Sequence, residues 1–130
     1  MVDMAERILD AARDTTPGAA TRLTQLRLAL SREVAEHCGS EVSLLKARPA
    51  PKDAAAAELV RHYHDDMLRW RHDLIACNSD WPPKRVFERP AAFARAFEPI
   101  LRRLRERVRW EEQVFYPAVL YADLSPAAAR

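Results

Sequence analysis

The sequence has very few glycines, few cysteines, almost no net charge and no long apolar run. Gly18 and Gly39 are the only glycines among its 130 residues. This scarcity excludes a phosphate-binding P-loop and a dinucleotide-binding glycine fingerprint. The formal net charge of +2 gives no reason to expect a nucleic-acid partner. No apolar run approaches the roughly 20 residues that a membrane-spanning helix requires, so no membrane partner is expected.

Two further absences concern the compartment and the cysteines. Residues 1–18 contain no basic region followed by an apolar block, so they do not read as a secretory signal. We therefore expect a cytoplasmic protein. Cys38 and Cys77 are expected to remain thiols, because antiparallel helices of the predicted lengths would hold them more than about 20 Å apart.

The residues that are abundant favour helices. The chain is 48% hydrophobic, too much for a disordered protein, and is rich in Ala, Leu, Arg and Glu. Its length predicts one domain covering residues 1–130. Clusters of proline divide it into helices expected at about 3–14, 20–46, 53–78 and 90–120. The short connections predict an all-α, up-and-down four-helix bundle. Asp53 is placed to cap the third helix, Pro90 suits the first turn of the fourth, and Pro99 predicts a kink or break within it.

Apolar residues recur at helical spacing and predict the core. The predicted core positions are Leu23, Leu26, Leu30 and Val34 in the second helix, Ala56, Val60, Tyr63, Met67, Trp70, Leu74 and Cys77 in the third, and Phe93, Phe97, Ile100, Leu104, Val114, Phe115 and Ala118 in the fourth. One face of each long helix is therefore expected to point towards its neighbours.

Polar side chains interrupt these apolar faces. His37 and Glu41 continue the face of the second helix, Arg107 and Glu111 continue that of the fourth, and His62 and Asp66 lie at the edge of the third. Folding the helices back on one another places His37, His62 and Arg107 in one layer. Glu41 and Glu111 then share the next layer, and Asp66 lies about one turn away.

The polar positions predict a cation site. A buried carboxylate needs a cation, a hydrogen-bond partner or a proton. Glu41, Asp66 and Glu111 together with Arg107 leave two negative charges, which one divalent ion would balance. His37 and Glu41 are one helical turn apart, the spacing at which a helix supplies two ligands to one ion. Imidazole and carboxylate together suit iron, manganese or zinc better than calcium.

Two motifs resemble the hemerythrin-like, or HHE cation-binding, domain. His37-Cys38-Gly39-Ser40-Glu41 is similar to the family's second-helix His-x-x-x-Glu, and the segment 109–117, RWEEQVFYP, is similar to the end of its last helix. The likeness covers about residues 20–120. It implies a non-haem di-iron centre in a four-helix bundle, with roles in binding O2 or another small diatomic, in sensing, or in redox and nitrosative stress.

The same resemblance implies a set of ligands. His37 and Glu41 match second-helix ligands, and Glu111 or Glu112 matches the last-helix carboxylate. His62 and Asp66 lie where the third helix would contribute. The sequence departs from the family in its first helix, which has no histidine, and at Arg107, where the family has a histidine. We therefore expect an incomplete site that holds one non-haem ion, or an incomplete di-metal site, in a sensing or redox protein rather than an enzyme.

Two alternatives remain open at this point. In the first, Arg107 replaces the ion and satisfies Glu41 and Glu111 through forked hydrogen bonds, so that a metal-free bundle acts as an interaction or regulatory module for a partner protein. In the second, the outward stripe of Arg102, Arg105 and Arg109 binds nucleic acid. Interspersed glutamates make a solvated face the simpler interpretation of this stripe. The short first helix also predicts that any ion would be exposed on that side.

Overall fold

A computed structural model describes residues 1–47, 50–51 and 53–120, and these residues are almost entirely helical. They form α1 (Val2–Arg13), α2 (Ala19–Lys46), α3 (Ala54–Asp80), α4 (Pro83–Glu88), α5 (Pro90–Trp110) and a π-helix, η1 (Glu111–Leu120), with no strand in the described ranges. The predicted all-α class is confirmed. None of these helices combines the length and the apolar character needed to cross a bilayer.

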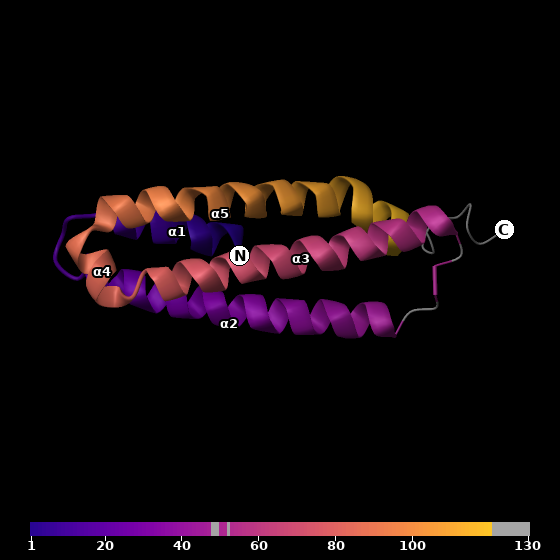
Figure 1. Cartoon of the computed structure of the whole chain (residues 1–130), viewed down its shortest axis with the longest axis horizontal. Helices are drawn as coiled ribbons and strands as arrows, with labels where there is room; N and C mark the ends of the chain where they lie inside the picture. The colour runs from indigo at the N-terminus through magenta and orange to yellow at the C-terminus, as the bar shows by residue number, and fades with distance from the viewer. Residues whose placement is uncertain (48–49, 52, 121–130) are drawn as a thin grey trace.

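Successive long helices run in opposite directions along an elongated molecule (Figure 1). α1 has 12 residues against 28 in α2, and it packs on both α2 and α5 over only one half of their length. Its N-terminus therefore lies near the middle of the molecule (Figure 1). α3 packs against α5 and η1. α1 therefore does not pack against the other half of the molecule.

The helix boundaries follow largely from single residues. The side chain of Asp53 accepts a hydrogen bond of 2.7 Å from the backbone N–H of Ala56, which confirms the predicted cap of α3. Pro90 occupies the first turn of α5, as expected. α5 continues through Pro99, so the last predicted helix divides at Glu111 instead.

The residues between the third and fourth predicted helices form α4, a helix that the sequence pattern does not predict. Trp81-Pro82-Pro83 ends α3, as predicted, but Pro83 also begins α4. Proline suits the first turn of a helix, because its missing N–H would be unpaired there in any case. The pair of prolines therefore ends one helix and starts another.

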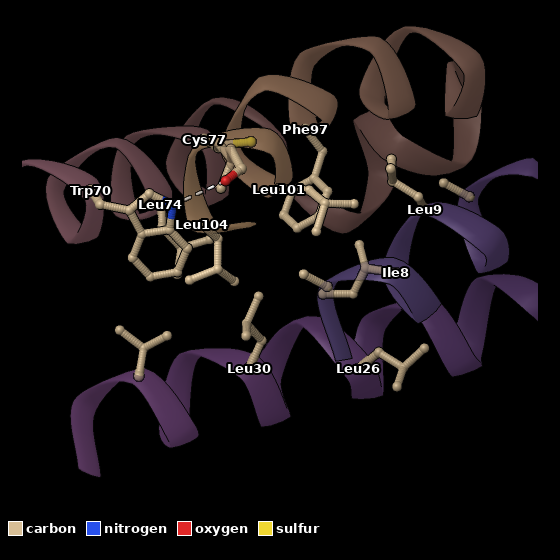
Figure 2. Packing of buried hydrophobic residues seen from close by; sticks show 14 of the residues in the cluster. Ile8, Leu9, Leu26, Leu30, Trp70, Leu74, Cys77, Phe97, Leu101 and Leu104 are labelled. Carbon is tan, nitrogen blue, oxygen red and sulfur yellow. Dashed lines mark hydrogen bonds between the residues drawn. The ribbon is translucent and has the colours of Figure 1, made fainter. Parts of the chain in front are cut away.

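Most of the predicted apolar faces are buried and meet between the helices (Figure 2). In α2 all four predicted positions are buried, and in α3 the five from Tyr63 to Cys77 are buried while Ala56 and Val60 are partly buried. The Trp70 indole N–H donates a 3.0 Å hydrogen bond to the carbonyl of Ile100, which ties α3 to α5 (Figure 2). The sequence therefore identified this part of the core correctly.

Leu30→Ala is expected to lower the free energy of unfolding by about 2–5 kcal/mol, because Leu30 is buried among other apolar side chains and alanine leaves a cavity. The matched control is Leu28→Ala on the same helix, where the leucine is 53% exposed. This control should change stability by no more than about 0.5 kcal/mol. If urea denaturation gave the same loss of stability for both variants, the result would contradict the burial of Leu30 in the core.

The π-helix changes which residues of the last segment face inward. Phe115 is buried, as predicted, but Val114 and Ala118 are exposed, so their assignment to the core is wrong. The prediction assumed the α-helical period, whereas η1 has the wider turns of an i→i+5 helix. Pro117 offers a cause, because in an α-helix its ring would clash with the carbonyl of Gln113.

Candidate metal centre

The candidate centre is a group of three side chains from α2 and η1. His37 and Glu41 are one turn apart on α2, with 2.7 Å between His37 Nε2 and Glu41 Oε1. Glu111, buried at the start of η1, joins them from the other side. One possible ligand atom from each of the three residues lies within 4.8 Å of the other two. The structure thus brings together three of the five predicted ligands.

Arg107 holds Glu111 in place from the preceding turn. Its Nη2 donates a 2.6 Å hydrogen bond to Glu111 Oε1, and both side chains are more than nine-tenths buried. Asp66 Oδ2 lies 3.6 Å from Arg107 Nε. Arg107 makes no hydrogen bond with Glu41 in the described part of the chain. Of the two predicted partners of Arg107, Glu111 is therefore found and Glu41 is not, and Asp66 is the second carboxylate beside the guanidinium.

The two predicted third-helix ligands lie beside Arg107, and neither belongs to the three-residue group. Asp66 contacts the guanidinium and does not join the three-residue group. His62 is exposed, and its ring lies edge-on to Trp110 with 4.7 Å between the ring centroids. Both residues line a separate pocket of about 250 Å³. Glu112, the alternative last-helix ligand, is exposed.

Tyr116 belongs to the site, although the sequence analysis did not single it out. Its hydroxyl lies 3.0 Å from Glu41 Oε1 and 3.2 Å from Glu111 Oε2, within hydrogen-bonding distance of both carboxylates. Burial and these two carboxylates raise the pKa of Tyr116 above its usual range, so the phenol carries its proton. The signal that could have revealed it was Pro117, which indicated that the α-helical period changes here.

The electrostatics of the centre favour a positive ligand. Burial raises the pKa of Glu41, and the neighbouring Glu111 acts in the same direction, while His37 opposes the shift. With Glu41, Glu111 and Asp66 ionised, Arg107 neutralises only one of the three charges. Uptake of a cation or a proton would therefore stabilise the group.

A pocket of about 390 Å³ leads from the surface to the centre. Met1, His37, Glu111 and Tyr116 are among the residues that line it. It lies near the N-terminus of α1, beside the half of the molecule that α1 does not cover (Figure 1). Solvent and small solutes can therefore reach two of the candidate ligands, His37 and Glu111.

The cysteines lie outside the ligand group. Both are free and buried, which confirms the expectation that they are thiols. Burial raises the pKa of the Cys38 thiol, although Cys38 directly follows His37. A protonated, buried thiol is a poor nucleophile and a poor metal ligand. Cys38 therefore contributes to the packing of this region and does not act as a metal ligand.

Comparisons of the chain with protein-family models, with curated proteins and with solved structures give no match. What the centre can bind follows from its donors. One imidazole nitrogen and two carboxylates suit iron, manganese or zinc, and three protein donors beside an open pocket leave further coordination positions to solvent. The side chains present therefore fit one such ion.

Proposed function

We propose that this chain is a hemerythrin-like protein that binds one non-haem iron ion through His37, Glu41 and Glu111 and acts in sensing or redox protection in the cytoplasm. The observation that carries the proposal is the convergence of these three ligand atoms within 4.8 Å. The resemblance of the two motifs to the family adds support. In this proposal α1, α2, α3 and the α5–η1 segment are the four members of an up-and-down bundle, and α4 is a connection.

The residues around the ligands have defined parts in the proposed site. Arg107 binds Glu111 Oε1 at 2.6 Å, which leaves Glu111 Oε2 for the ion and fixes the orientation of the carboxylate. Asp66 neutralises Arg107, so a divalent ion balances the ionised Glu41 and Glu111. An iron ion would supply redox chemistry at the end of the open pocket, where O2 or another small diatomic can arrive.

Calorimetric titration of the metal-free protein tests the proposal. We expect about one Fe(II) ion per chain under anaerobic conditions, with Mn(II) and Zn(II) as comparison ions. The double variant His37→Ala, Glu41→Ala should bind none of them at the same concentrations. The matched control is His72→Ala, Glu36→Ala, which removes an exposed imidazole and an exposed carboxylate and should bind as the wild type does. Absence of binding to the wild type, or unchanged binding to the first double variant, would contradict the proposal.

A metal-free interaction module is the second candidate function. The 2.6 Å pair of Arg107 and Glu111, with Asp66 Oδ2 3.6 Å from Arg107 Nε, favours it, because one guanidinium contacts both carboxylates without an ion. The same titration separates the two candidates. If the protein is folded but binds none of the three ions, the result supports the metal-free interaction module. The next step is then a search for a partner protein.

We also expect the ion to be removed readily by a chelator. The 390 Å³ pocket opens directly on His37, Glu111 and Tyr116, so the chelator has access to the bound ion. Dialysis of the loaded protein against EDTA, followed by plasma mass spectrometry, should show nearly complete loss within hours. Retention of the ion through prolonged dialysis would contradict an open site.

A further inference from the structure

The phenol of Tyr116 lies between the two candidate carboxylate ligands. We infer that Tyr116 is a fourth ligand, which binds the ion as a phenolate and makes the site selective for ferric iron. The inference rests on the proposed function, since it concerns the same site. Its evidence is the position of the Tyr116 hydroxyl, 3.0 Å from Glu41 Oε1 and 3.2 Å from Glu111 Oε2.

The distances match those between two ligands of one ion. Oxygen ligands lie about 2.0–2.2 Å from a transition-metal ion, so two neighbouring ligands at octahedral or tetrahedral angles are about 2.8–3.6 Å apart. The Tyr116 hydroxyl has this separation from one oxygen of each carboxylate. The other oxygen of Glu111 is held by Arg107. An ion placed between Glu41 Oε1 and Glu111 Oε2 would therefore have the phenol oxygen within reach.

The π-helix is what brings Tyr116 to this position. Tyr116 is five positions after Glu111, and in an α-helix this spacing would turn their side chains about 140° apart. In η1 the i→i+5 repeat places them on one face. Short π-helical segments occur frequently at functional sites. The change of period at Glu111 thus gives the centre one more oxygen donor.

The charges then favour a trivalent ion. Glu41, Glu111 and a Tyr116 phenolate carry three negative charges, His37 is a neutral ligand, and Asp66 cancels Arg107. In the metal-free protein the phenol carries its proton, so binding must release that proton to solvent: Tyr–OH and Fe(III) give Tyr–O–Fe(III) and H⁺. A hard anionic oxygen stabilises Fe(III) more than Fe(II), because the attraction grows with the charge of the ion. The expected resting state is therefore ferric.

Optical spectroscopy of the ferric protein tests the inference. Wild-type protein loaded with Fe(III) citrate should show a visible charge-transfer band and phenolate modes in its resonance Raman spectrum. Tyr116→Phe should lose both, and its affinity for Fe(III) relative to Zn(II) should fall at least about tenfold. The matched control is Tyr63→Phe, which removes a buried hydroxyl that has no hydrogen-bond partner among the described residues and keeps the ring stacked on Phe115. This control should retain the band.

The possible outcomes separate the inference from the proposed function. Iron bound by the wild type without the band, or a band that survives in Tyr116→Phe, would overturn the inference and leave the iron site standing. Failure of the wild type to bind iron would overturn both. Circular dichroism checks that Tyr116→Phe folds. If it does not, ring-deuterated tyrosine in Tyr63→Phe tests the inference: phenolate modes that shift on deuteration support a tyrosine ligand, and the absence of such modes overturns the inference.

Discussion

Arg107→Ala is expected to lower the free energy of unfolding of the metal-free protein by about 3–5 kcal/mol. Arg107 and Glu111 are 9% and 6% exposed, so the variant leaves a buried carboxylate without its cation, and Asp66 loses the same partner. A divalent ion at the centre should return part of the lost stability, because it supplies positive charge beside Glu111. Urea denaturation with and without saturating Zn(II) measures both effects.

The matched control is Arg103→Ala on the same helix. Arg103 forms an ion pair with Asp73, and both side chains are 36% exposed. Exposed ion pairs contribute about 0–1 kcal/mol, so this variant should change stability little, and Zn(II) should not alter the difference. Equal destabilisation by the two substitutions would show that the buried Arg107 pair does not hold the centre together.

Glu41→Gln is expected to separate binding from stability. Because burial raises the pKa of Glu41, the ionised carboxylate opposes folding at neutral pH, and this cost disappears as the pH falls below the folded-state pKa. Glutamine has nearly the same shape and can still accept the hydrogen bond of Tyr116, but it carries no charge. The metal-free variant should be as stable as the wild type or more stable at pH 7. Its affinity for Fe(II) should fall about 100-fold or more, since an anionic ligand is lost.

Glu36→Gln serves as the control for this prediction. Glu36 is exposed on the same helix, so the substitution removes one carboxylate charge without touching the centre. Thermal unfolding and calorimetric titration should both match the wild type. If Glu41→Gln destabilised the metal-free protein while leaving the affinity unchanged, Glu41 would be a packing residue and not a ligand.

Patterns set by the α-helical period could be predicted from the sequence. The buried face of α2 from Leu23 to Val34, the Asp53 cap and the C-terminal ends of α1, α2 and α3 follow from local rules, whereas the break predicted at Pro99 does not occur. The same period predicts that His37 and Glu41 lie on one face of the helix, and in the structure His37 Nε2 is 2.7 Å from Glu41 Oε1. These features depend on few residues close in sequence, and tertiary packing does not override them.

Features that depend on a change of period or on side-chain reach could not be predicted in the same way. The π-helix exposes Val114 and Ala118 and brings Tyr116 to the centre, although an α-helical projection places Tyr116 elsewhere. Arg107 pairs with Asp66 and not with Glu41 because of the relative depth of α3 and α5, which is set by the loops and not by the helical period. His62 lies at the edge of the apolar face of α3, as predicted, and is exposed.

Anomalous X-ray diffraction from crystals of the iron-loaded protein tests the central claim most directly, because it locates the ion. We predict one peak at the iron edge, about 2.0–2.2 Å from a nitrogen of His37 and from carboxylate oxygens of Glu41 and Glu111. Arg107 and Asp66 should remain paired outside the ligand sphere. A peak elsewhere on the chain, or loaded protein whose iron lies away from all three residues, would contradict the account.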